Sequence, residues 1–204
     1  MKVHIDRHSA PPSQPLVCGC LNVRSLSNKV DNLLDVRRDQ LTDVLFLTET
    51  WHDADSICLR RLRADRFQVV DRPRLRLCTD TLMTNHGGIA VVASSGLPLS
   101  TMDLGVTPFM FELLCVRIVS GSSSFIAATI YRPGSAATSV LFFTELSNVL
   151  DRLATFVEPI LLTSDINIRL ERLTNSDTDQ FIDILAVRGL NTVSHLLLTT
   201  SMDR

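Results

Sequence analysis

The sequence has 204 residues, 45% of them hydrophobic, and a net charge of −2, which suffices for one folded domain with a sizeable core. This composition excludes general disorder, and the small net charge excludes a global electrostatic attraction to nucleic acid or membranes. The N-terminal residues lack the apolar core of a signal peptide, and no apolar run approaches the roughly 18 residues of a membrane span. We therefore expect an intracellular protein, nuclear or cytoplasmic, that is not secreted and has no membrane partner.

Hydrophobic periodicity predicts the elements of the first half in chain order. Residues 1–14 are polar and rich in proline, so we expect a flexible tail, with the folded domain over residues 15–204. The domain then begins with a strand at 16–23 buried on both faces, a helix at 28–41 with Asn28 as N-cap and Leu41 on its apolar face, a buried strand at 43–50, a short helix at 56–65 and a strand at 67–71.

The second half continues the alternation of short strands and helices. It contains a strand at 87–93, a hairpin of strands 111–119 and 124–133, an amphipathic helix at 139–156, a strand at 159–165, and a helix at 176–190 with Ser176 as cap and Gly189 as stop. Short strands with hairpins, and helices at intervals, indicate an α/β (α+β) fold in which the helices pack on sheet faces.

The cysteines give no sign of a disulfide framework or a zinc site. Their number is odd, their spacing is scattered, and none forms a CxxC pair. We expect small buried side chains in a reducing compartment. The cysteines are Cys18, Cys20, Cys58, Cys78 and Cys115.

Three apolar runs end in residues able to bind a metal or a phosphate. The first run ends at Asn22, the second at Glu49, and the strand at 159–165 ends at Asp165, with Asn167 just beyond. Such oxygen ligands suit Mg²⁺, which prefers carboxylates, waters and substrate phosphates. Taken singly, each residue is equally typical of a turn or a helix cap, since Asn and Asp favour those positions for their own reasons.

Sequence context adds to this pattern. The segments "LNVRSLSNKVDNL", "LFLTETW", "IYRPG" and "SDIN" resemble, in this order, motifs of the endonuclease/exonuclease/phosphatase family, above all its branch in non-LTR (LINE-type) retrotransposons, which is related to the apurinic endonucleases. The resemblance covers about residues 16–193. It implies a DNase-like, four-layer sandwich of two mostly antiparallel β-sheets flanked by helices. The family's motif positions fall on Asn22, Glu49, Tyr131 with Pro133, Asp165 and Asn167.

The resemblance also implies roles for these residues. Glu49 would hold Mg²⁺, or alternatively Mn²⁺. Asn22 and Asn167 would orient phosphate oxygens or the attacking water, Asp165 would position or activate that water, and Tyr131 would donate a hydrogen bond to the phosphate. The implied reaction is hydrolytic nicking of DNA, which leaves a 3′-hydroxyl that a reverse transcriptase of a parent polyprotein would extend.

The sequence departs from the family pattern in two places. Ser164 and Ile166 stand where the family's Gly-Asp-Phe-Asn motif has glycine and phenylalanine, and the family's later Asp-His pair has no counterpart after Asn167. No motif position falls on His195, and we expect His52 and His86 to be surface histidines. From the missing pair we expect a C-terminally truncated domain that lacks its last strands and nicks DNA weakly or not at all.

Two further interpretations stay open. Arg60, Arg61 and Arg63 begin an arginine-rich stretch that either binds a phosphate backbone or forms a solvated face balanced by nearby aspartates. The domain itself is alternatively a non-catalytic nucleic-acid-binding or interaction relic of the same element, or a phosphatase of the same fold, because fold does not determine function.

Overall fold

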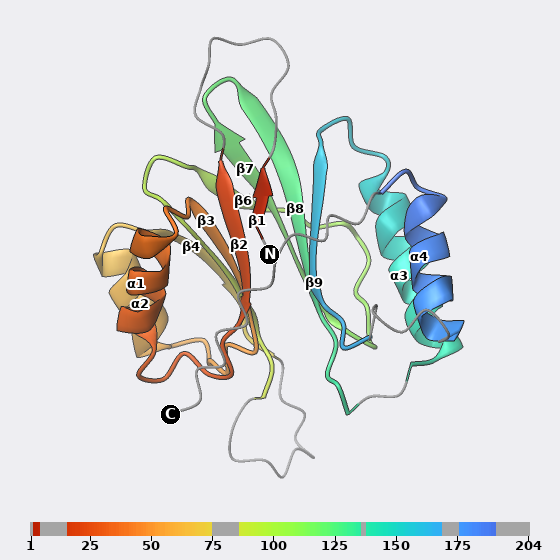
Figure 1. Ribbon diagram of the computed structural model, residues 1–204, viewed down its shortest axis with the longest axis horizontal. Helices are drawn as coiled ribbons and strands as arrows, with labels where there is room; N and C mark the ends of the chain where they lie inside the picture. The colour runs from red at the N-terminus through yellow and green to blue at the C-terminus, as the bar shows by residue number, and fades with distance from the viewer. Residues whose placement is uncertain (1, 5–15, 75–85, 136–137, 169–175, 191–204) are drawn as a thin grey trace. The chain divides into compact units, whose positions relative to one another are not determined.

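The computed structural model describes residues 2–4, 16–74, 86–135, 138–168 and 176–190. They fold as two compact units, the N-terminal unit within residues 1–99 and the C-terminal unit within residues 100–193. In each unit two helices cover one face of a mixed, mostly antiparallel β-sheet (Figure 1). The predicted α/β class is confirmed in both units.

The N-terminal unit is built on a five-stranded sheet in the order β1-β2-β3-β5-β4. Strands β2 and β3 run parallel, and the other neighbouring strands run antiparallel. The elements are β1 (Lys2–His4), β2 (Val17–Asn22), α1 (Val30–Asp39), β3 (Val44–Thr48), α2 (Ile57–Ala64), β4 (Gln68–Arg72) and β5 (Ile89–Ala93).

The core of this unit lies between the sheet and its two helices. All residues of β3 and β5 are buried, as the apolar runs predict for central strands. Leu33 of α1 and Leu59 and Leu62 of α2 face the sheet, because they recur at helical spacing. They pack against Leu45, Leu47, Ala90 and Val92.

The first strands differ from the prediction. Within β2 only Cys18 is fully buried, so the strand is not buried on both faces. One reason is that its outer neighbour β1 is three residues long and covers only the Val17–Gly19 part of it. That neighbour comes from the expected tail, since Lys2–His4 pair with β2, while residues 5–15 lie outside the described part of the chain.

Helix α1 is shorter at both ends than its sequence pattern suggests. Lys29, not Asn28, occupies the N-cap position, and Asn28 takes a left-handed turn conformation with φ 60°. At the other end Leu41 is 79% exposed and is also left-handed, with φ 48°. The amide of Thr42 donates to the Arg37 carbonyl at 3.0 Å, which gives the closure pattern of a Schellman motif with leucine in the usual glycine position. The helix therefore ends before Leu41 can join its apolar face.

The C-terminal unit has a four-stranded sheet in the order β6-β7-β8-β9. Strands β7 and β8 are antiparallel, and β8 and β9 are parallel. Helices α3 and α4 lie on the same face (Figure 1), where their apolar side chains form one core with those of the sheet. The elements are β6 (Leu99–Thr101), β7 (Glu112–Ser120), β8 (Ser123–Tyr131), α3 (Val140–Leu153), β9 (Ile160–Asp165) and α4 (Ser176–Ala186).

Local sequence signals explain most of these boundaries. The predicted hairpin turns at Gly121, whose φ of 59° suits glycine, between the paired residues Ser120 and Ser123. The side chain of Ser139 caps α3 by accepting a hydrogen bond from the Phe142 amide at 3.2 Å. Strand β6 was not predicted, because three residues are too few to show a period.

The parallel strand pairs place the ends of two strands together in each unit. Asn22, the last residue of β2, is paired with Thr48, the last residue of β3. In the C-terminal unit Tyr131, the last residue of β8, is paired with Asp165, the last residue of β9. Residues that end parallel strands lie at the same edge of a sheet, so each unit presents its own group of predicted site residues.

Among the described residues no helix is long and apolar enough to cross a membrane. No disulfide joins the described cysteines, Cys18, Cys20, Cys58 and Cys115, and Cys78 lies outside the described residues. Burial, assisted by the nearby Asp43 carboxylate, raises the pKa of the Cys18 thiol to about 12. Cys18 is therefore a packing residue rather than a reactive thiol.

Candidate functional site

In the N-terminal unit, Asn22 and Glu49 form a hydrogen-bonded pair. The Asn22 carboxamide Nδ2 donates to Glu49 Oε1 at 2.7 Å, and Asn22 Oδ1 accepts from the Arg24 amide at 3.1 Å. Asn22 is exposed and Glu49 is half-buried. The contact joins the ends of β2 and β3 and leaves the carboxylate near solvent, where it can meet a cation or a substrate.

The turn that carries Glu49 has an unusual backbone. Glu49 and Trp51 both adopt left-handed conformations, with φ 52° and 49°, and the fully buried Thr50 lies between them. Such conformations cost about 1–3 kcal/mol each and persist where surrounding contacts fix them. Here the carbonyls of Glu49 and Thr50 accept hydrogen bonds from the amides of Ser25 and Leu26, at 2.7 and 3.0 Å.

His52, predicted to be a surface histidine, is instead 3% exposed and belongs to a buried polar chain. Its Nδ1 lies 2.5 Å from the Thr50 hydroxyl, and its Nε2 lies 3.1 Å from Asp71 Oδ2. The other Asp71 oxygen accepts from the Arg63 guanidinium. We call Thr50, His52, Asp71 and Arg63 the Thr50–Arg63 chain. The sequence does not reveal it, because His52 follows a polar run and its partner is 19 residues further on.

His86 also differs from the surface position predicted for it. It is half-buried, and its ring contacts that of Trp51 in a tilted arrangement, with centroids 4.3 Å apart and planes at 55°. Trp51 belongs to the turn after Glu49, so both predicted surface histidines contact residues of that turn.

Asp71 gives the first testable prediction. The hydrogen bond from His52 lowers its pKa, burial opposes this, and Arg63 adds to the lowering. A carboxyl group whose folded-state pKa is below its ordinary value of about 3.9 stabilises the fold above that value and loses the contribution as pH falls through the lowered pKa. Asp71→Asn should therefore lower the free energy of unfolding by about 2 kcal/mol at pH 7, with the difference from wild type shrinking below about pH 4.

Urea unfolding followed by the fluorescence of Trp51, the single tryptophan, measures this difference between pH 3 and pH 7. Asp35→Asn is the matched control, because Asp35 is 61% exposed in its surface pair with Arg38 and should contribute little at any pH. A difference for Asp71→Asn that stays constant across the range would contradict the assignment.

The predicted substrate-binding arginines are mostly engaged in ion pairs. Arg61 pairs with Asp31 at 2.5 Å, and Arg63 pairs with Asp71, whereas Arg60 is exposed. The pair with Asp31 raises the pKa of Arg61. Contacts with phosphate by Arg61 or Arg63 would require each to leave a carboxylate, so their positions favour the balanced face over a phosphate-binding stretch.

In the C-terminal unit, the turn after β9 carries Asp165 and Asn167. The Arg132 amide donates to the Asp165 carbonyl at 3.0 Å, which extends the pairing of β8 and β9 by one residue. Tyr131 is buried and Asp165 is half-buried. Asn167 is left-handed with φ 53°, a conformation that asparagine tolerates. Its Nδ2 donates to the Arg132 carbonyl at 2.8 Å.

Arg132, which was not predicted as a site residue, holds this turn. It is 2% exposed, its Nε donates to the Ile166 carbonyl at 2.7 Å, and its guanidinium also donates to the Asn167 carbonyl at 3.1 Å. The guanidinium carbon lies 5.4 Å from the centre of the Phe142 ring. Burial lowers the pKa of Arg132, while Asp177 opposes the shift. An arginine directly after a mostly apolar strand is the sequence signal that marks it.

Gly134 allows the same turn to close. A Cβ atom at this position would lie 3.2 and 3.3 Å from Asn167 Cγ and Oδ1, closer than ordinary van der Waals contact. The "YRPG" and "SDIN" segments are therefore packed against each other through Arg132, Gly134 and Asn167. This contact gives a physical reason for the two motifs to occur together.

The residues present suit a magnesium site of the simplest kind. Among the described residues no three His, Cys, Asp or Glu side chains form a cluster that would enclose a metal. Mg²⁺ keeps several waters and is commonly bound by one or two carboxylates together with substrate phosphates. The half-buried Glu49 carboxylate, held by Asn22, fits that description. The described residues do not provide the ligands for a site made of protein groups alone.

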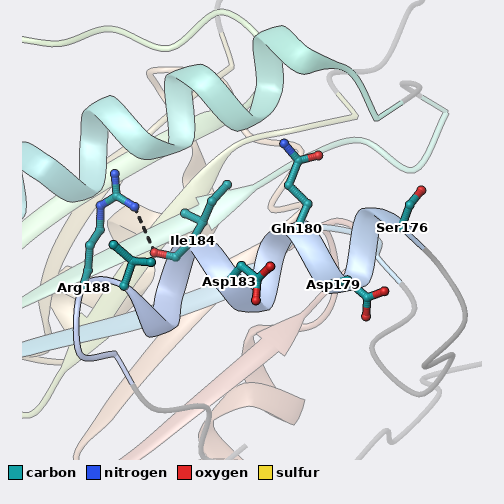
Figure 2. Close-up of a pocket in the computed structure, with 7 residues that line it drawn as sticks. Ser176, Asp179, Gln180, Asp183, Ile184 and Arg188 are labelled. Carbon is teal, nitrogen blue, oxygen red and sulfur yellow. Dashed lines mark hydrogen bonds between the residues drawn. The ribbon is translucent and has the colours of Figure 1, made fainter.

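A separate hollow of about 450 Å³ lies along α4 and contains none of the predicted site residues. Figure 2 shows its lining residues along α4, where Arg188 donates to the Ile184 carbonyl at 2.9 Å. Because Asp179 and Asp183 give it a negative rim, it is a poor site for a phosphodiester. The lining residues are Ser176, Asp179, Gln180, Asp183, Ile184, Val187 and Arg188.

No protein-family model matches the chain, and no curated protein sequence matches it significantly. Solved structures are similar to it. The catalytic domain of human Nocturnin with bound sulfate has a TM-score of 0.60 at 16% identity, over 79% of this chain and 66% of that one. The endonuclease domain of TRAS1, a telomere-specific non-LTR retrotransposon, has a TM-score of 0.58 at 10% identity, over 83% and 69%. The 3′ phosphatase NExo from Neisseria, bound to a product DNA hairpin, has a TM-score of 0.53 at 17% identity, over 83% and 69%.

These similarities confirm the DNase-like α/β fold that the resemblance implies. The chain spans 66% of the length of the Nocturnin structure and 69% of the other two. Identities of 10 to 17% establish the fold alone, and fold does not determine function. The function therefore has to be inferred from the residues at the strand ends.

Proposed function

We propose that this chain is a divalent-metal-dependent phosphodiester hydrolase whose substrate is DNA. The observation that carries the proposal is the 2.7 Å hydrogen bond between Asn22 and Glu49 at the ends of two parallel strands. It provides an accessible carboxylate, oriented by an uncharged partner, in a fold shared with nucleases. A single oriented carboxylate beside a phosphate is the minimal requirement for Mg²⁺ chemistry.

Glu49 would hold Mg²⁺, or Mn²⁺ in its place. The bound ion would polarise the scissile phosphate and neutralise negative charge in the transition state. Asn22 orients the Glu49 carboxylate through Nδ2, and its uncharged carboxamide adds no repulsion toward phosphate oxygens. Loss of the Asn22 contact would leave the carboxylate free to rotate away.

For the residues at the ends of β8 and β9 in the C-terminal unit, the resemblance implies contacts with the attacking water and the phosphate. Asp165 is half-buried at the end of β9, and its carboxylate can accept the proton of that water. Asn167 donates one amide hydrogen to the Arg132 carbonyl, and its carboxamide oxygen and second hydrogen would contact substrate or water. Tyr131, at the end of the neighbouring strand, would donate a hydrogen bond to the phosphate.

DNA is proposed as the substrate on two grounds. The sequence segments resemble those of retrotransposon endonucleases, and similar structures include the TRAS1 endonuclease domain and NExo with a product DNA hairpin. A nick with a 3′-hydroxyl would serve a reverse transcriptase of a parent polyprotein. We expect a low rate, because the sequence has no consecutive Asp-His pair, which the resemblance assigns to the scissile phosphate.

The test is nicking of supercoiled plasmid by the purified chain. We expect slow conversion to the open circle with Mg²⁺, none with a chelator, and nicks that a DNA polymerase can extend. Asp165→Asn should lower the rate by about 10²-fold or more, since a positioned acid or base contributes about 10²–10⁴-fold. Ser164→Ala, at the exposed neighbouring residue, is the matched control and should keep the rate.

Other outcomes would contradict the proposal in distinct ways. Salt-dependent DNA binding without nicking would indicate a non-catalytic nucleic-acid-binding module. Release of phosphate from an inositol phosphate, with no nicking, would indicate a phosphatase of the same fold. Nicking that Asp165→Asn does not change would mean that a contaminant or another group performs the reaction.

A further inference from the structure

We propose that His52 is a positioning residue. It fixes the turn from Glu49 to His52 and thereby holds the Glu49 carboxylate toward Asn22. The inference rests on the proposed function, because it concerns the residue to which metal binding is assigned. His52 follows Glu49 by three residues and is buried, so it acts through the backbone rather than on substrate.

The turn needs fixing because its backbone is held in sparsely populated conformations. Glu49 and Trp51 are both left-handed, on either side of Thr50. The amides of Thr50 and Trp51 donate to the carbonyls of Gly88 and Gly87, at 3.2 and 2.8 Å. These backbone bonds set the path of the chain, and the only side chain between the two left-handed residues is that of Thr50. The Thr50 hydroxyl is bonded to His52.

The direction of the hydrogen bonds follows from Asp71. An ionised carboxylate only accepts hydrogen bonds, so His52 Nε2–H donates to Asp71 across 3.1 Å. In the neutral ring Nδ1 then accepts the proton of the Thr50 hydroxyl, 2.5 Å away. Each member therefore fixes the orientation of the next, from Asp71 in β4 to Thr50, two residues after the end of β3.

Gly88 packs closely against the Thr50–Arg63 chain. A Cβ atom at Gly88 would lie 2.5 Å from Thr50 Oγ1 and 3.0 Å from His52 Nδ1, and Gly88 has φ 96°. The backbone of Gly88 thus lies close to the Thr50–His52 pair, and only glycine leaves space for that pair at this position. We therefore expect a change in the pair to alter the turn, and with it the position of Glu49.

The test uses the side-chain amide signal of Asn22 in nitrogen-15 NMR spectra of the whole chain, without metal or DNA. The signal is assigned by its loss in Asn22→Ala, and Glu49→Ala defines its position when the Asn22–Glu49 hydrogen bond is absent. In His52→Leu we expect the signal to move at least halfway to the Glu49→Ala position. Val92→Ala, a cavity variant in β5 that leaves the turn unaltered, should keep it at the wild-type position.

A second pair of variants decides the matter if His52→Leu does not fold. Thr50→Val removes the hydroxyl and should move the Asn22 signal, whereas Thr50→Ser retains the hydroxyl and should keep it. The proposal would be overturned if the Asn22 signal stayed at the wild-type position in His52→Leu and Thr50→Val. It would also be overturned if the signal moved equally far in Val92→Ala.

Nicking provides a separate readout. In His52→Leu the Mg²⁺ concentration for half-maximal nicking should rise about tenfold, as for partners that orient metal ligands, with a smaller change in the rate at saturating Mg²⁺. A wild-type chain that fails to nick DNA would count against the proposed function, while the Asn22 signal would still decide the role of His52.

Discussion

Glu49→Gln should lower the rate of plasmid nicking about 10³-fold and leave the fold unchanged. Glutamine has the shape of glutamate, and its Oε1 can still accept the hydrogen bond that Asn22 Nδ2 donates to Glu49 at 2.7 Å. The substitution therefore removes the negative charge and keeps the geometry. A loss of 10³-fold corresponds to about 4 kcal/mol of transition-state stabilisation, within the range expected when a metal ion no longer neutralises the reacting phosphate.

Two control variants separate charge from position. Asp55→Asn removes an exposed carboxylate six residues further along the chain and should not affect nicking. Glu49→Asp keeps the charge but shortens the side chain by one methylene, so the contact with Asn22 is lost, and the rate should fall by about 10- to 100-fold. Equal rates for Glu49→Gln and wild type, at full Mg²⁺, would remove Glu49 from the metal site and the proposed function with it.

The residues that end the apolar runs were predictable, because burial of a strand is visible in its composition. Asn22, Glu49 and Asp165 each follow such a run, and the structure places the first two in contact. The buried partners that support them were not predictable. His52 and Asp71 meet only because β4 and the turn after β3 both lie beside β5, and a polar residue in a polar run gives no sign of burial.

The ends of the helices were likewise predictable only in part. Ser56 and Ser139, the first residues of two predicted helices, are the N-caps of α2 and α3, whereas the predicted cap Asn28 lies one residue before the N-cap of α1. Leu41 was assigned to the wrong environment, because its spacing continues the apolar stripe of α1 while the chain has already closed the helix. Periodicity reports which residues would share a face, and only the backbone hydrogen bonds decide where the helix ends.

Arg132→Met should lower the free energy of unfolding of the C-terminal unit by about 3 kcal/mol. Methionine retains a flexible apolar stem beside Phe142 but leaves the carbonyls of Ile166 and Asn167 without the donors that Arg132 provides. Hydrogen bonds from a charged donor contribute about 1.5–3 kcal/mol each. Relief of the cost of burying the guanidinium offsets part of that loss, which is why the expected value is below the sum.

The single tyrosine makes this measurement specific. Tyr131 lies next to Arg132, so the fluorine-19 signal of fluorotyrosine follows unfolding of the C-terminal unit, and the urea midpoint should fall by about 1–2 M. Arg117→Met is the matched control, because Arg117 is half-exposed in its ion pair with Glu158 and should contribute about 0–1 kcal/mol. Arg132→Lys keeps the charge without the planar fork and should recover only part of the loss. If Arg132→Lys restores full stability, the charge of Arg132 rather than its bonds to the Ile166 and Asn167 carbonyls holds the turn, and the assigned role of those contacts is wrong.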